Sequence, residues 1–349
     1  MPYAVYTCQG IYKGNDADAG QVRQNVILYI DLLHGGQYSM INRREFVAAS
    51  AGMLAGGLWS GRSEGFGESR TRLILLGTGG GPRPRKNGAA SSQVIVVNGV
   101  AYVVDCGDGV ARQMASAGVM LPTIRHIFIT HHHSDHNADY GNLMLLAWAV
   151  GLRTRVDTWG PPPLQRMTEL FLEMSAPDID TRVADEGHPP LAPLLHAHEI
   201  RGAGAVMDDG NVKVTAAVVH HPLIKLALAY RFDSSDRSIV ISGDTTPSDS
   251  LIRLAQGADV LVHEAIYLPG IDRLIARTPN PGRLREHILA SHTTAEDAGR
   301  IAQAAGVKVL VLSHLAPADD PAVTDQMWID AARVHFRGSV IVGKDLMEI

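Results

Sequence analysis

The segment from residue 130 to residue 136 constrains the fold of this chain more than any other. It reads Thr-His-His-His-Ser-Asp-His and directly follows an apolar Ile-Phe-Ile run, which is typical of a buried β-strand. Because alternate side chains of an extended segment point the same way, His131 and His133 can reach one ion. Asp135 and His136 follow where the chain turns, and they can reach a second ion beside the first. Zinc accepts imidazole and carboxylate ligands, whereas the alternative, a solvated histidine-rich loop, needs neither the Asp nor the strand. The segment therefore predicts a metal site at the end of a strand.

This motif resembles the His-x-His-x-Asp-His signature of the metallo-β-lactamase superfamily, which His131, His133, Asp135 and His136 match. The resemblance implies an α/β protein with the αββα sandwich of that superfamily. It also implies a zinc-dependent hydrolase with two zinc ions per chain, in which a hydroxide between the ions attacks the substrate. In such a sandwich the remaining ligands stand just past later strands of the chain.

The resemblance places the next ligand at the end of a strand, where His220 and His221 both occur. Adjacent strand residues face opposite sides, so one of the two can reach the metal. We favour His221, because its His-Pro-Leu context resembles the ribonuclease Z and arylsulfatase-like branch, and His220 is the alternative. The Ser-Gly-Asp-Thr sequence at 242–245 looks like a turn of the family and makes Asp244 the bridging carboxylate, although a plain turn or helix cap can have the same sequence. After another apolar run, His314 is the last ligand.

The resemblance therefore assigns seven metal ligands. One zinc takes His131, His133 and His221, the other takes Asp135, His136 and His314, and Asp244 lies between the two ions. Two catalytic roles follow from the same resemblance. Asp135 also orients the attacking hydroxide, and His292 takes the place of the histidine that protonates the leaving group in ribonuclease Z. The alternative for His292 is an ordinary residue at the start of a helix.

Other polar residues are assigned to supporting roles. The glycine-rich sequence at 77–82 lacks the Gly-Lys-Ser/Thr ending of a nucleotide-binding loop, so we interpret it as a tight turn beside the metal site. Asp105 and Glu264 stand in segments that resemble ribonuclease Z, and we expect them to support the ligands rather than to bind metal. His132 is expected to face away from the ligands. Six histidines have no motif around them and are expected to be surface or structural residues: His126, His188, His196, His198, His287 and His335.

The N-terminal part of the chain predicts export. Asn-Arg-Arg-Glu-Phe-Val at 42–47 precedes a small and apolar stretch that ends at Trp59, and this order looks like a twin-arginine signal. A membrane span needs about twenty apolar residues, so no stable span is expected here. We divide the chain into a misassigned N-terminal extension (1–39), a twin-arginine signal peptide with a short linker (40–69) and a metallo-β-lactamase-fold hydrolase domain (70–349). An amphipathic helix with a chance arginine pair is the alternative.

The substrate prediction depends on charge and on export. The chain has 31 Lys and Arg residues against 36 Asp and Glu, a net charge of −5, whereas a surface that binds transfer RNA is expected to be basic. The long Gly-Pro-rich arm by which ribonuclease Z grips its substrate is not evident either. We therefore predict a periplasmic or secreted binuclear zinc hydrolase that cleaves an ester-type bond (phosphodiester, sulfate ester or lactone) in a small molecule. The twin-arginine export machinery is an expected partner, nucleic acid is not, and homodimers are common in the related families.

Three alternatives remain open. The first is a ribonuclease Z-type endonuclease that processes the 3′ end of tRNA. The second is a metal-binding protein without catalysis, although the ligand set leaves a coordination position open for hydroxide. The third is iron in place of zinc, since histidines and carboxylates hold either metal.

Overall fold

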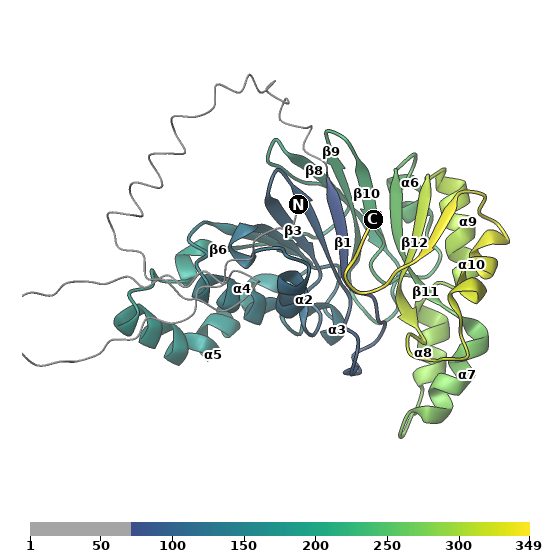
Figure 1. Ribbon diagram of the computed structural model, residues 1–349, viewed down its shortest axis with the longest axis horizontal. Helices are drawn as coiled ribbons and strands as arrows, with labels where there is room; N and C mark the ends of the chain where they lie inside the picture. Colours follow the sequence, from purple (N-terminus) through teal and green to yellow (C-terminus); the bar gives the residue numbers. More distant parts are fainter. Residues whose placement is uncertain (1–70) are drawn as a thin grey trace, which may run out of the picture. The chain divides into compact units, whose positions relative to one another are not determined.

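The computed structural model describes residues 71–349, in which two β-sheets pack face to face with helices on their outer faces (Figure 1). The predictions made for residues 1–39 and 40–69, including the twin-arginine leader, lie outside the described residues. The periplasmic or secreted location therefore stays a prediction. Between residues 71 and 349, none of the helices combines the length and the apolar character that crossing a membrane requires.

The first sheet is formed by the N-terminal strands of the described chain and by its last strand. Its strands are β1 (Arg72–Gly77), β2 (Ser92–Val97), β3 (Val100–Val104), β4 (Ile124–Phe128), β5 (Val156–Gly160), β6 (Leu195–Glu199) and β14 (Met347–Glu348). In space they follow the order β14-β1-β2-β3-β4-β5-β6, antiparallel from β14 to β3 and parallel from β3 to β6. The helices on its outer face are α2 (Val110–Ser116), α4 (Tyr140–Ala149) and α5 (Leu164–Asp185).

The second sheet follows in sequence and packs on the inner face of the first. Its strands are β7 (Gly204–Asp208), β8 (Val212–Val219), β9 (Ala227–Ser234), β10 (Ser238–Ile241), β11 (Val260–Ile266), β12 (Val309–Ala316) and β13 (Ser339–Val342). They are antiparallel from β7 to β10 and parallel from β10 to β13. The helices on its outer face are α6 (Asp249–Leu254), α9 (Ala295–Ala305) and α10 (Asp325–Arg333).

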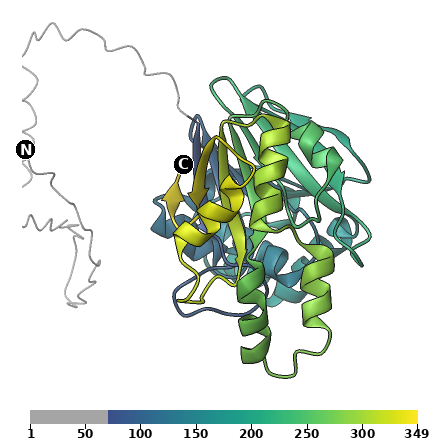
Figure 2. The ribbon, with the colours of Figure 1, turned by 90° about the vertical axis from the view of Figure 1, so that its right-hand side faces the viewer.

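Shorter elements connect these layers. The helix α3 (Ser134–Asn137) begins inside the histidine-rich segment, and two 3₁₀ turns span Leu121–Thr123 and Ala192–Leu194. The helices α7 (Leu268–Arg277) and α8 (Leu284–Ser291) form a hairpin between β11 and α9 that projects beyond the sheets (Figure 2). The end of α8 leads directly to His292, so this hairpin borders the site described below.

Alternating side chains explain why the sheets need a layer on each face. In β1, Leu73 and Leu75 pack between the two sheets, whereas Ile74 and Leu76 pack under the helices of the first sheet. All four side chains are buried, which is typical of a strand covered on both faces. The αββα sandwich implied by the sequence resemblance is therefore confirmed.

Candidate metal centre

Loops from both sheets meet at one edge of the sandwich. The carboxyl ends of parallel strands lie together, so the residues that follow β4 in one sheet and β10, β11 and β12 in the other become neighbours. The structure collects three overlapping groups whose ligand atoms lie within 4.8 Å of one another. They are His131, His133, His221 and Asp244, then Asp135, His136 and His314, and finally Asp244, His292 and His314. The seven predicted ligands are all members of these groups.

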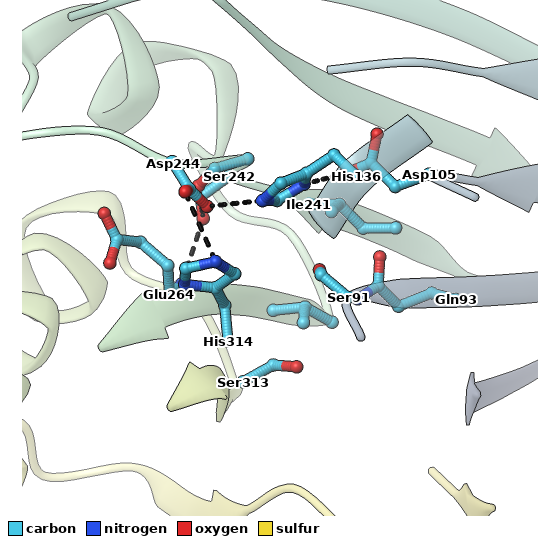
Figure 3. Close-up of a pocket in the computed structure, with 12 residues that line it drawn as sticks. Ser91, Gln93, Asp105, His136, Ile241, Ser242, Asp244, Glu264, Ser313 and His314 are labelled. Carbon is cyan, nitrogen blue, oxygen red and sulfur yellow. Dashed lines mark hydrogen bonds and ion pairs between the residues drawn. The ribbon is translucent and has the colours of Figure 1, made fainter. Parts of the chain in front are cut away.

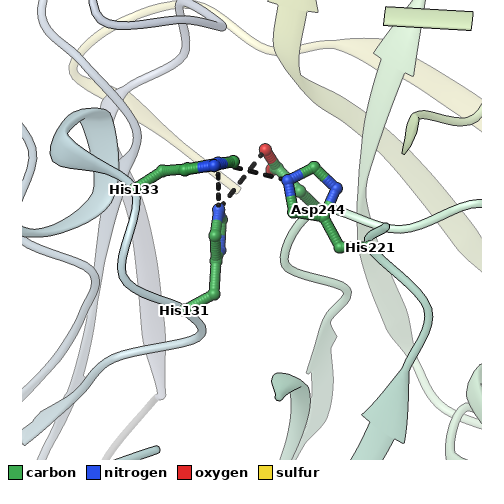
Figure 4. A group of neighbouring side chains, drawn as sticks. All are labelled: His131, His133, His221 and Asp244. Atoms are coloured by element: carbon green, nitrogen blue, oxygen red, sulfur yellow. Dashed lines mark hydrogen bonds and ion pairs between the residues drawn. The ribbon is translucent and has the colours of Figure 1, made fainter. Parts of the chain in front are cut away.

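Three histidine nitrogens converge in the first group (Figure 4). His133 Nδ1 lies 3.1 Å from His131 Nε2 and 3.2 Å from His221 Nε2. Nitrogen ligands around a tetrahedral zinc ion are about 3.3 Å apart, so this spacing fits a single metal ion. Asp244 completes the group, with its Oδ2 atom 3.8 Å from His131 Nε2.

Asp244 also faces the ligands of the second group. His314 Nε2 lies 3.2 Å from Asp135 Oδ2 and 3.3 Å from Asp244 Oδ2. His136 Nε2 lies 3.3 Å from Asp244 Oδ1. Figure 3 shows the Asp244 carboxylate beside the rings of both His136 and His314. Asp244 is therefore the carboxylate that both groups of side chains share.

The burial of these side chains fits a divalent cation. Of the seven, His133 alone is partly exposed. His136 Nε2 and Asp244 Oδ1 are buried, and although they lie 3.3 Å apart, neither makes a hydrogen bond of good geometry within residues 71–349. A cation would satisfy both atoms. Burial also holds the pKa of His131 well below its ordinary value, which keeps the ring in the neutral form that binds metal. The donor set therefore forms a site for divalent metal.

His314 reaches this site because β12 has a β-bulge at that position. The strand was expected to end before His314, whereas it continues to Ala316 with one extra residue relative to β11. His314 has a φ of 46°, which turns its side chain out of the regular alternation. Gly80 packs against it, and the N–H of Gly81 donates to Asp135 Oδ2 at 2.9 Å. The glycine-rich turn thus lies beside the site, as predicted.

Neighbouring acceptors orient two of the ligand rings. His136 Nδ1 donates to Asp105 Oδ2 at 2.7 Å, which directs its Nε2 atom to the centre of the site. His221 Nδ1 donates to the backbone carbonyl of Ser291 at 2.9 Å, with the same effect on its Nε2 atom. Partners of this kind fix the ring nitrogen that is free to bind metal. Asp105 therefore supports a ligand, as expected.

His292 lies next to the metal groups and is held by Glu264. Its Nδ1 atom is 3.1 Å from both carboxylate oxygens of Glu264 and 3.9 Å from Asp244 Oδ2. Burial lowers the pKa of His292, but the charge and the hydrogen bond of Glu264 outweigh it and raise the pKa to about 9. The ring is therefore protonated at neutral pH and can donate a proton in the site. Glu264 is itself held by the N–H of Thr245 at 2.9 Å.

The structure distinguishes the histidines that sequence reasoning left ambiguous. His221 is buried in the first group, whereas His220 is exposed, as expected for adjacent strand-end residues. His132 faces away from the ligands, with its Nε2 atom 2.7 Å from the carbonyl of Pro161. His221 therefore lies among the side chains that could hold a metal ion, whereas His220 and His132 lie outside these groups.

His287 lies in a place that the sequence did not predict. It was expected to be a surface or structural histidine, but its ring centre is 6.1 Å from that of His133 and 6.0 Å from that of His221. The sequence signal that could have found it is its position one helical turn before Ser291, next to His292.

The chain is similar in sequence to known proteins and in fold to solved structures. The sequence model of the β-lactamase superfamily domain matches residues 101–315. Ribonuclease Z of Mycobacterium bovis (strain BCG / Pasteur 1173P2) is 32% identical over 280 residues, 79% of this chain and 97% of that protein. Ribonuclease Z of Mycobacterium sp. (strain KMS) is 34% identical over 281 residues, 79% of this chain and 95% of that protein. The crystal structure of human tRNase Z, short form, shares the fold with a TM-score of 0.59 and 22% identity, covering 80% of this chain and 98% of that one.

These similarities overturn two predictions. The prediction of a hydrolase for small-molecule esters is wrong, because relatives that match along nearly their whole length are ribonucleases. The expectation that nucleic acid is not a partner is wrong for the same reason. Net charge is a sum over the whole chain, whereas binding depends on the charges near the site. A cavity of about 270 Å³ beside Asp135 is lined by Arg83 and Arg85, and also by Asp108.

Proposed function

Because the chain belongs to the β-lactamase superfamily and its relatives there are ribonucleases Z, we propose that it is a metal-dependent endonuclease that removes the 3′ trailer from precursor transfer RNA. The observation that carries this proposal is the pair of ligand groups beside Asp244. Two adjacent ions suit a phosphodiester, because the attacking and the leaving oxygen both need stabilisation during displacement at phosphorus. We propose zinc as the metal, with two ions per chain, since zinc favours histidine and carboxylate ligands at this spacing.

Each residue of the site has a separate role in this reaction. Divalent ions, when bound, supply Lewis acidity at the phosphate and make water a better nucleophile. Asp135 accepts a hydrogen bond from the attacking water and so orients it. His292 carries a proton at neutral pH and donates it to the departing ribose oxygen. Glu264 holds the opposite side of the His292 ring and stabilises its positive charge.

Cationic side chains near the ligands support RNA as the substrate. The cavity beside Asp135 is lined by Arg83 and Arg85 and also by Asp108, and Arg83 is paired with Asp319 at 2.7 Å. Arg85 donates to the backbone carbonyl of Gly80, which holds the guanidinium close to the glycine-rich turn. Arginine in such a position attracts the phosphates that flank the one being cut.

The proposal is tested with the full-length protein loaded with zinc and a precursor tRNA that has a 3′ trailer. Wild type is expected to cut at the end of the mature tRNA, and elemental analysis is expected to give two zinc ions per chain. Asp244→Asn removes the shared carboxylate charge and is expected to lose more activity than the about 10–100-fold typical of an outer partner. The control is His335→Gln, because His335 is exposed and bonded to Glu296 far from the ligands. Intact RNA in a preparation that hydrolyses aryl phosphodiesters would refute the proposal.

A further inference from the structure

His287 lies beside the metal centre, but it is neither one of the proposed ligands nor part of the proton transfer described above. Its ring centre lies 6.1 Å from that of His133, 6.0 Å from that of His221 and 5.8 Å from that of His292. His287 is partly exposed, like His133, so both rings stand where solvent reaches the site. A substrate bound at the exposed side of His133 would therefore lie near His287.

The helix α8 places His287 firmly. Ile288 is buried and Leu284 packs with it against Ile271 of α7, so one side of α8 is fixed in the hairpin shown in Figure 2. His287 and Ser291 are four residues apart and therefore lie on the same helix face. The carbonyl of Ser291 accepts from the ring of His221, which ties this face of α8 to the metal centre.

One nitrogen of His287 is free to bind a ligand. Its Nδ1 atom lies 3.4 Å from the hydroxyl of Ser291, a long contact. With that hydroxyl donating to Nδ1, the ring carries its proton on Nε2. Within residues 71–349, Nε2 of His287 has no hydrogen-bond partner. Because His287 is partly exposed, this nitrogen can exchange its contact with water for one with a bound ligand.

We propose that His287 is a phosphate-binding residue whose Nε2–H donates a hydrogen bond to a non-bridging oxygen of the phosphodiester at the metal centre. The inference rests on the proposed function for the identity of the substrate. The donor itself would serve any phosphate bound at the metal groups, including inorganic phosphate. Imidazole N–H suits this task because it donates to an anionic oxygen while leaving the ligand set unchanged.

A set of three variants tests the role of the Nε2 atom. The amide nitrogen of Gln can replace Nε2 of histidine, the amide of Asn reaches only as far as Nδ1, and Ala removes both donors. The full-length zinc-loaded proteins His287→Gln, His287→Asn and His287→Ala are compared with wild type and with the exposed His335→Gln control. Bound zinc is measured by elemental analysis, folding by circular dichroism, and affinity for inorganic phosphate by titration calorimetry. Cleavage of precursor tRNA is measured in the same preparations, with kcat and KM determined separately.

We expect the Ala and Asn variants to bind phosphate about 10- to 100-fold more weakly, the usual effect of losing a hydrogen bond to a charged group, while Gln stays close to wild type. Zinc content is expected to be equal in all variants. Lower zinc content in the Ala variant would assign His287 to metal binding and overturn the inference, as would unchanged phosphate affinity or an equal loss in Gln, Asn and Ala. If the wild-type protein cuts no RNA, but the Ala and Asn variants at His287 bind phosphate more weakly than wild type, the proposed function fails and the inference stands. If all variants cut RNA and bind phosphate as well as wild type does, the proposed function stands and the inference fails.

Discussion

Replacing Gly80 with alanine tests how the fold positions the ligand His314. A Cβ atom at Gly80 would lie 2.8 Å from the backbone oxygen of His314 and 2.9 Å from its Nδ1 atom. These distances are about half an ångström short of ordinary contact, and the backbone of β12 is fixed in the sheet, so the imidazole ring or the glycine-rich turn has to move. Functional sites tolerate displacements of about 0.5 Å at most. We therefore expect Gly80→Ala to lower the metal affinity of the group that contains His314 by about 10–100-fold. Loss of a residue that orients a ligand has an effect of similar size.

The assay is a competition between the protein and a coloured zinc chelator, which resolves the affinity of each metal position. Circular dichroism confirms that the variant is folded. The matched control is Gly202→Ala, because neither glycine has a positive φ and a Cβ at Gly202 meets no atom within 4 Å. Weaker binding at one zinc position in Gly80→Ala, with Gly202→Ala unchanged, is the expected result. Equal zinc affinity in both variants would show that the glycine-rich turn shifts without moving His314. Gly80 would then not be needed to position this ligand.

Three further variants test other parts of the argument. Asp105→Asn removes the negative charge behind His136, and zinc titration is expected to show about 10–100-fold weaker binding; an unchanged affinity would contradict the orienting role of Asp105. His292 is protonated below its pKa of about 9 and loses the proton as the pH rises through that value, so activity should fall on the alkaline side. Glu264→Gln removes the charge that raises this pKa, and the alkaline limb of the pH–rate profile should move to lower pH; a limb that stays in place would assign it to another group. Leu310→Ala leaves a cavity in place of a fully buried side chain and is expected to lower the free energy of unfolding by about 2–5 kcal/mol in urea titrations, whereas a loss below about 1 kcal/mol would mean that the core refills the space.

Local sequence patterns predicted the framework of the site more reliably than its substrate. Alternation along a strand is a property of a few neighbouring residues, so the order of His131 and His133 after an apolar run was informative by itself. The same alternation favoured His221 over His220, and the structure buries the first and exposes the second. The choice of substrate used net charge and a leader outside the described residues, neither of which reports on the local surface that meets RNA. Similarity along the chain, rather than composition, corrected it.

The sequence by itself determined which residue types stand at strand ends and in what order, because strand periodicity and the spacing of ligands are encoded within short segments. The tertiary structure decided what those residues meet. The bulge that turns His314 into the site forms only when β12 pairs with β11, and the contact between His292 and Glu264 joins residues 28 apart in the chain. His287 acquires its place beside the ligands because α8 packs on α7 through apolar side chains. Contacts of this kind depend on how separate elements pack, and no local pattern contains that information.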